Sequence, residues 1–102
     1  MNQTGLPEWL QTLKERSPKF SEMYLTQRDE VLKDGAIPAK YKLLMTMIVD
    51  AVSAHAGGCA AIANRARTKG ATEEEIMEAV QVAYLFGGTP ALVTAVSALK
   101  RD

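Results

Sequence analysis

The sequence predicts an all-α domain of about six helices, and three observations support that prediction. Signals for the start of a helix recur along the chain, at Pro7, Ser17-Pro18, Ile37-Pro38 and Thr89-Pro90. The apolar residues between these signals follow the spacing of one helical face, and no convincing run alternates as a half-buried strand would. With 102 residues, of which 47% are hydrophobic, the chain is long enough to bury a modest core as one domain over residues 1–102.

Two helices are expected in the first third of the chain. Proline is tolerated at the first position of a helix, so Pro7 and Pro18 mark two helix starts, and Ser17 suits the cap of the second. Asp34-Gly35 is a natural end for the second helix. The apolar stripes of the two helices are Trp9, Leu10 and Leu13, and then Phe20, Tyr24, Val31 and Leu32.

A third and a fourth helix are expected around a pair of glycines. Ile37-Pro38 opens the third helix, and Gly57-Gly58 interrupts the pattern. The fourth helix is expected from about Gly58 to Lys69, with Gly70 as its C-terminal glycine. One face of the third helix is formed by residues at offsets of 0, 4, 7 and 11, which are Leu44, Ile48, Ala51 and His55.

The last two helices are the most clearly marked. Thr72-Glu73-Glu74-Glu75 has the pattern of a capping box, in which the Thr hydroxyl and the Glu75 carboxylate satisfy backbone N–H groups reciprocally. The helix that follows is expected to end at Gly87-Gly88, and Thr89-Pro90 starts the last helix. The residues expected to face inward are Ile76, Val80 and Ala83, followed by Leu92, Val96 and Leu99.

Charge and composition exclude several classes of protein. Twelve basic and twelve acidic residues give a formal net charge of zero, which argues against a nucleic acid or an anionic membrane as the partner. The apolar stretch Leu43–Val49 is too short to cross a bilayer, and the first fifteen residues lack the apolar run of a signal peptide. A single cysteine excludes an intrachain disulfide and a zinc site built on several cysteines. We therefore expect a cytoplasmic protein without a metal or other cofactor.

Small residues point to self-association. Alanine allows helices to approach closely, and a chain of short helices often completes its core against a second copy of itself. We therefore expect a homo-oligomer. The alanines that support this expectation are Ala51, Ala54, Ala60, Ala61, Ala63, Ala66, Ala91, Ala95 and Ala98.

Three segments stand in a distinctive order. Ile37-Pro38-Ala39-Lys40 precedes a long apolar helix, and Lys69-Gly70-Ala71-Thr72-Glu73-Glu74-Glu75-Ile76 follows a short helix. Gly87-Gly88-Thr89-Pro90-Ala91 comes near the end of the chain. Together they resemble the carboxymuconolactone decarboxylase and alkylhydroperoxidase D-like family. The resemblance implies a compact all-α fold that assembles into dimers, trimers or hexamers.

The family's catalytic residues are not kept at the matching positions of this sequence. The redox branch of the family has Cys-x-x-Cys-x-x-x-His across the start of the short helix, and a Glu one helix earlier. Alignment without gaps places His55 and Gly58 at the two cysteines, Ile62 at the histidine and Leu43 at the glutamate. A peroxidase that uses two cysteines of one chain is therefore excluded, because a dithiol needs two thiols. The decarboxylase branch keeps the histidine, and this sequence departs from that pattern too.

His55 and Cys59 are the candidate catalytic residues. They are four residues apart, so a helical backbone would place them on one face. An imidazolium beside a thiol at the start of a helix lowers the pKa of the thiol and yields a reactive thiolate. Structural roles stay open, since cysteine is commonly buried and Gly57-Gly58 can bend the chain between the two. Asp50, within the apolar third helix, is either a general base or a solvated or paired carboxylate.

Two classes of function follow from these residues. The first is an enzyme, either a peroxidase-like oxidoreductase that uses one cysteine or a relative of the lactone decarboxylase. The second is a catalytically silent, oligomeric protein that binds a small molecule or serves as a scaffold. A small-molecule pocket between helices would suit either class, with the lining Leu44, Ile48, His55, Cys59 and Ile62.

Overall fold

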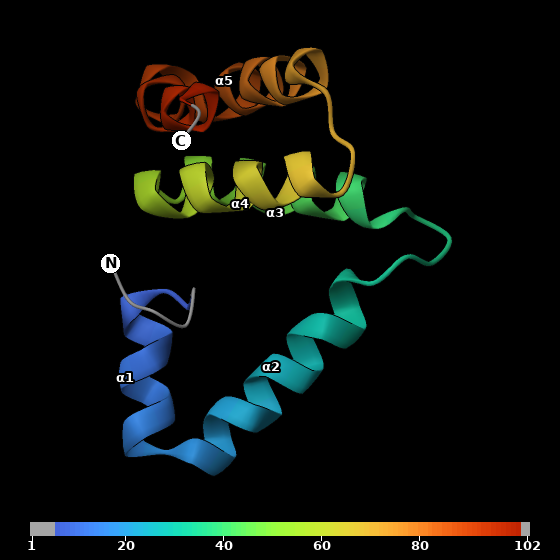
Figure 1. Cartoon of the computed structure of the whole chain (residues 1–102). Helices are drawn as coiled ribbons and strands as arrows, with labels where there is room; N and C mark the ends of the chain where they lie inside the picture. The colour runs from blue at the N-terminus through green and yellow to red at the C-terminus, as the bar shows by residue number, and fades with distance from the viewer. Residues whose placement is uncertain (1–5, 101–102) are drawn as a thin grey trace. The chain divides into compact units, whose positions relative to one another are not determined.

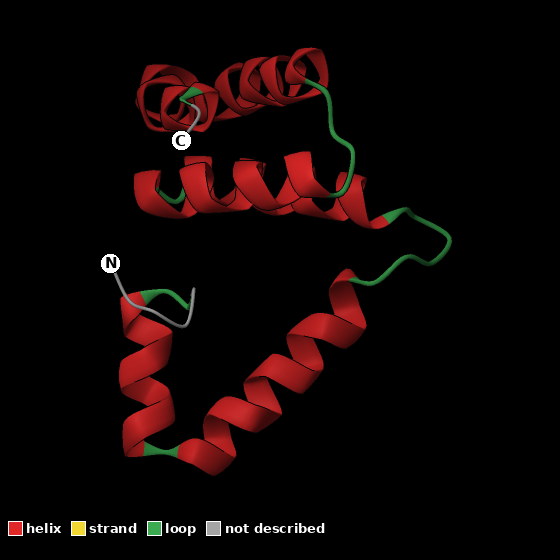
Figure 2. Ribbon diagram, in the orientation of Figure 1, coloured by secondary structure: helices red, strands yellow, loops and turns green. Residues whose placement is uncertain are grey.

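The computed structural model describes residues 6–100, and all regular structure in that part of the chain is helical (Figures 1 and 2). The expectation of an all-α fold is thus confirmed. The chain divides into two units, residues 1–33 and residues 34–102. The single domain expected over residues 1–102 stays a prediction.

The first unit is a pair of helices, α1 (Glu8–Arg16) and α2 (Pro18–Leu32). An edge-to-face contact joins them, with 5.6 Å between the ring centroids of Trp9 and Tyr24. The guanidinium of Arg28 lies 5.9 Å from the centroid of the Tyr24 ring. Among the large apolar side chains described in this unit, only Leu10 is fully buried. Two side chains of the expected α2 stripe, Phe20 and Val31, are exposed.

The second unit contains α3 (Ala39–Val52), α4 (Ala56–Thr68), α5 (Glu73–Ala95) and the 3₁₀ helix η1 (Val96–Leu99). The carboxylate of Asp34 accepts a hydrogen bond from the Ala39 backbone N–H at 2.7 Å, at the start of α3. Lys40 pairs with Glu75 at the start of α5, and Val52 lies against Gly87 twelve residues further along both helices. These two contacts show that α3 and the first part of α5 run parallel to one another. The largest fully buried side chains of this unit are Leu43, Met47, Cys59, Ile76 and Val80.

The turns at the ends of α3 and α4 have the same backbone geometry. The N–H of His55 donates to the carbonyl of Asp50 at 2.8 Å, and the N–H of Ala71 donates to the carbonyl of Ala66 at 2.9 Å. Both bonds belong to the Schellman pattern, in which the residue just past the helix end adopts a left-handed conformation. Gly70 fills that position after α4 with φ 100°, but after α3 it is Ala54, with φ 64°. The turn that leads to His55 therefore carries backbone strain that a glycine would avoid.

The structure corrects three details of the expected helices. Helix α4 begins at Ala56, so Gly57 and Gly58 lie inside its first turn and the break comes before them. The helical assignment runs past Gly87, although Gly88 leaves helical geometry at φ 77° and ψ −172° and bends α5. After that bend the residues expected to face inward, Leu92, Val96 and Leu99, are displaced from the core by Ala91, Ala95 and Ala98.

The segment Glu73–Leu99 is long and apolar enough to cross a membrane, with a mean hydropathy of 1.6. Its inward face packs in the core of the second unit, through Ile76, Val80 and Ala83. The bend at Gly88 also divides it into two shorter pieces. Only 22% of its most apolar stretch is buried, so the segment contributes one face to the core and exposes the rest, and the expected cytoplasmic location stays a prediction.

Candidate functional site

Asp50 and His55 meet where α3 ends and α4 begins. Their side chains form a pair with 3.5 Å between His55 Nδ1 and Asp50 Oδ1. The imidazole is 67% exposed, whereas the carboxylate is 24% exposed. A Cβ atom at Gly58 would lie 2.6 Å from Asp50 Oδ2, so the absence of a side chain there leaves room for the carboxylate. The site therefore presents a solvent-reachable imidazole held from behind by a partly buried carboxylate.

Cys59 lies away from solvent, in the core between α3 and α4. Its side chain is 0% exposed, and Sγ donates to the Met47 carbonyl at 3.5 Å. Burial raises the pKa of the Cys59 thiol to about 11, and the negative charge of Asp50 adds to the shift. Its link to His55 is a backbone one, because the Cys59 N–H donates to the His55 carbonyl at 2.9 Å. The two predicted site residues are thus neighbours in the chain with opposite surroundings.

We expect Cys59 to react slowly with alkylating reagents. A pKa of about 11 in place of the ordinary 9.0 leaves about a hundredfold less thiolate at pH 8, because the thiolate is the nucleophile. Iodoacetamide should therefore modify Cys59 in the folded protein at least a hundredfold more slowly than in the chain unfolded by guanidinium chloride. Since the pKa is higher in the folded state, the thiol contributes stability that is complete below pH 9 and is lost as the pH rises toward 11. A native rate equal to that of the unfolded chain would contradict this assignment.

An open groove of about 340 Å³ lies between α3 and α5, on a different side of the unit. Of the residues expected to line a pocket, it contains Leu44 and Ile48 but not His55, Cys59 or Ile62. Eight residues line this α3–α5 groove: Tyr41, Leu44, Met45, Ile48, Glu75, Glu78, Ala79 and Val82.

The start of α5 closes one end of that groove with charged groups. The capping box is formed as predicted, with 3.0 Å from the Glu75 N–H to the Thr72 hydroxyl and 2.9 Å from the Thr72 N–H to the Glu75 carboxylate. The Thr72 N–H, and then Lys40, lower the pKa of Glu75. The hydrogen bond to Glu75 in turn raises the pKa of Lys40, whose Nζ lies 5.0 Å from the centroid of the Tyr41 ring.

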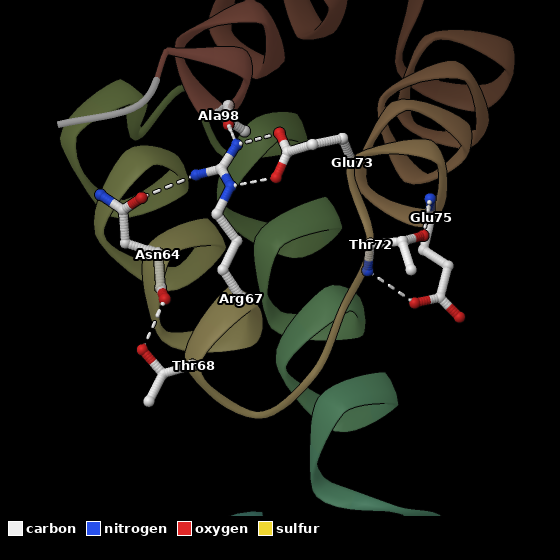
Figure 3. Close-up of polar contacts among 7 residues, drawn as sticks. All are labelled: Asn64, Arg67, Thr68, Thr72, Glu73, Glu75 and Ala98. Carbon is white, nitrogen blue, oxygen red and sulfur yellow. Dashed lines mark hydrogen bonds and ion pairs between the residues drawn. The ribbon is translucent and has the colours of Figure 1, made fainter.

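The structure also contains a polar network around Arg67 that the sequence analysis did not predict (Figure 3). The guanidinium donates to both Glu73 oxygens, at 2.7 and 2.9 Å, and to Asn64 Oδ1 at 2.6 Å. It also donates to the Ala98 carbonyl at 2.8 Å, so one side chain joins α4, α5 and η1. The signal in the sequence is a pair of opposite charges, Arg67 and Glu73, on either side of the Gly70 turn. The hydrogen bond to the Ala98 carbonyl depends on the fold and has no signal in the sequence.

The methionines differ in burial. Of the methionines in the described part, Met47 is in the core, whereas Met23, Met45 and Met77 are 60%, 49% and 43% exposed. Within residues 6–100, no group of three or more His, Cys, Asp or Glu side chains is placed to hold a metal ion.

The chain resembles known proteins over most of its length. The sequence pattern of the carboxymuconolactone decarboxylase family matches residues 18–101. The crystal structure of a protein from Burkholderia xenovorans LB400, provisionally assigned as a carboxymuconolactone decarboxylase, matches with a TM-score of 0.87 and 28% sequence identity. The match covers 94% of this chain and 76% of that one. No curated protein matches this sequence. The family match begins at the first residue of α2, so it includes every element that carries the candidate site.

Proposed function

This chain belongs to the carboxymuconolactone decarboxylase family, and on that premise we propose that it is a proton-transfer enzyme for a small carboxylated lactone or a related acid. The observation that carries the proposal is the contact of 3.5 Å between Asp50 Oδ1 and Nδ1 of an imidazole that solvent can reach. A carboxylate beside Nδ1 orients a histidine, which leaves Nε2 to exchange a proton with a substrate.

The chemistry of decarboxylation needs such a group. The bond between the carboxylate carbon and the rest of the substrate breaks, carbon dioxide leaves, and the electron pair remains on the substrate carbon. That carbon must then take a proton, which the imidazolium of His55 would donate from Nε2. Water restores the proton to the imidazole before the next turnover. Asp50 is a positioning residue in this scheme, because it acts through His55.

Carboxymuconolactone is the first substrate to test, in deuterium oxide, with carbon dioxide release and deuterium in the product as readouts. We expect His55→Gln to lower kcat/KM by about 10² to 10⁴. Asp50→Asn should lower it less, and Asp50→Glu should recover part of the loss. Thr68→Ala is the control: Thr68 lies at the exposed far end of α4, so this substitution should leave kcat/KM unchanged. Full activity in folded His55→Gln would refute the proposal.

A catalytically silent function has support of its own. Asp50 and His55 occupy the two positions of the Schellman pattern that usually make an apolar contact, so the pair has a local structural explanation. The α3–α5 groove also offers a binding surface that does not include them. A wild-type protein that releases no carbon dioxide and incorporates no deuterium, yet binds the lactone, would establish this function instead.

A peroxidase-like role for Cys59 is the least supported of the three. A pKa of about 11 leaves about one thiol in ten thousand ionised at pH 7. Oxidation to a sulfenic acid needs that thiolate and access for the peroxide, and the side chain is 0% exposed. Cys59 is better explained as a small buried side chain that allows α3 and α4 to pack.

A further inference from the structure

Two glycines lie in the first turn of α4, and the backbone conformation requires neither of them. Gly57 and Gly58 follow Ala56, the first residue of the helix, and neither adopts a positive φ. Glycine inside a helix is less favourable than alanine, because it loses more conformational freedom on folding. The reason for each glycine must therefore be sought in the atoms around it.

The surroundings of Gly58 supply a reason that those of Gly57 lack. A Cβ atom at Gly58 would lie 2.6 Å from Asp50 Oδ2, 2.9 Å from Asp50 Cγ and 3.4 Å from Asp50 Oδ1. The first two distances are too short for atoms that are not bonded, so the carboxylate would have to move. A Cβ atom at Gly57 would have no neighbour within 4 Å. The space that a side chain would take at Gly58 is thus occupied by the carboxylate of Asp50.

The carboxylate that fills this space is the one that meets His55. Its Oδ1 lies 3.5 Å from Nδ1 of the imidazole, and the His55 backbone N–H donates to the Asp50 carbonyl at 2.8 Å. The backbone contact follows the left-handed residue Ala54, with φ 64°, and such strain persists only where the surrounding structure holds it in place. The turn at Ala54 therefore places the imidazole, and the gap at Gly58 places the carboxylate.

From this arrangement we infer that Gly58 is a positioning residue for His55. Its lack of a side chain keeps the Asp50 carboxylate beside Nδ1, so the neutral imidazole carries its proton on Nδ1 and leaves Nε2 free to accept one. A residue with a Cβ atom at position 58 displaces the carboxylate, and the imidazole then divides between its two tautomers. The effect on the tautomer is a property of the fold, whereas its consequence for catalysis rests on the proposed function.

The tautomer can be measured without an activity assay, because His55 is the only histidine in the chain. In protein without a histidine tag, the ¹⁵N chemical shifts of imidazole Nδ1 and Nε2 at pH 9 give the ratio of the two neutral tautomers. We expect the wild type to favour the Nδ1–H form. Gly58→Ala should lower its ratio to the Nε2–H form by about tenfold, because a hydrogen bond to a charged group contributes at least that factor. Asp50→Ala, which removes the acceptor, should lower it by as much.

Gly57→Ala is the matched control, since it adds the same methyl group to the same turn without meeting another atom. It should leave the tautomer ratio at the wild-type value. An unchanged ratio in folded Gly58→Ala would overturn the inference, as would a wild type that favours the Nε2–H form.

The assay with carboxymuconolactone then connects the tautomer to catalysis. Gly58→Ala should lower kcat/KM to about the level of Asp50→Asn, whereas Gly57→Ala should not change it. Failure of the proposed function is distinguishable from failure of this inference. A wild type without decarboxylase activity refutes the former, and the response of the tautomer ratio to Gly58→Ala still decides the latter.

A second measurement keeps the inference testable if Gly58→Ala does not fold. The double variant Asp50→Ala/Gly58→Ala lacks the carboxylate that the added methyl group would meet. It should therefore fold and resist chemical denaturation at least as well as Asp50→Ala alone, since alanine is the better helix former. A double variant that is as unstable as Gly58→Ala would overturn the inference, because the cost of the methyl group would then not come from Asp50.

Discussion

Replacing Arg67 with methionine is expected to lower the free energy of unfolding by about 3 kcal/mol. The guanidinium is only 13% exposed and makes four hydrogen bonds, three of them to Glu73 and the Ala98 carbonyl. Hydrogen bonds to charged groups contribute about 1.5–3 kcal/mol each, and the partial exposure of Glu73 reduces the total. For a chain of this size the midpoint of thermal unfolding should fall by roughly 12–24 °C.

Two further variants distinguish the hydrogen-bond geometry of Arg67 from its positive charge. Arg67→Lys keeps the positive charge but cannot reach Glu73 with two parallel bonds, so it should recover less than half of the loss. Lys69→Met removes a positive charge from the exposed end of the same helix and should change stability by less than about 0.5 kcal/mol, as is usual for surface sites. Equal losses in Arg67→Met and Lys69→Met would show that the network contributes nothing beyond helix-end charge.

Adding a single methyl group at Gly87 is expected to cost about 2–3 kcal/mol. A Cβ atom there would lie 2.5 Å from the Ala91 Cβ and 2.7 Å from Val52 Cγ1, which is closer than carbon atoms can approach. Overpacking of this kind typically costs about 1–3 kcal/mol, because the neighbouring helices must move apart. Chemical denaturation of Gly87→Ala measures the loss directly.

The matched control, Gly57→Ala, is expected to change the free energy of unfolding in the opposite direction. Gly57 lies inside α4, and a methyl group added there would have no neighbouring atom within 4 Å, so Gly57→Ala should stabilise the protein by about 0.5–1 kcal/mol. Val52→Ala should also relieve part of the cost of Gly87→Ala, a coupling that a double-mutant cycle detects. Additive effects of Val52→Ala and Gly87→Ala would refute the close contact between α3 and α5.

Local chemistry made most of the fold predictable. Proline and capping residues act within a few positions of where they stand, and so the starts of α1, α2 and α5 follow from the sequence alone. The Thr72 box is the clearest case, since both of its hydrogen bonds join residues three apart. The same local reasoning failed after Gly88, because the left-handed bend changes which face of the following residues meets the core.

The site was less predictable because burial decides its chemistry. His55 and Cys59 have the spacing of a coupled pair, but the turn at Ala54 takes His55 out of the helix and leaves it exposed. The sequence could not show that Asp50 would reach back to this histidine, or that it would raise the pKa of Cys59. The contact of Arg67 with Ala98 joins residues 31 positions apart, a separation at which no local pattern is informative.

The parallel course of α3 and α5, with α4 running back between them in the chain, has an electrostatic consequence. At one end of the unit, the positive N-terminal poles of α3 and α5 lie beside the negative C-terminal pole of α4. Asp34, Glu73 and Glu75 face the positive poles, and Arg67 faces the negative pole. At the other end, neither α3 nor α5 has a basic residue in its last turn. Added salt therefore weakens the unit mainly at the first end. The end that carries His55 depends mainly on close packing, and the Asp50–His55 pair is the charged contact that salt screens there.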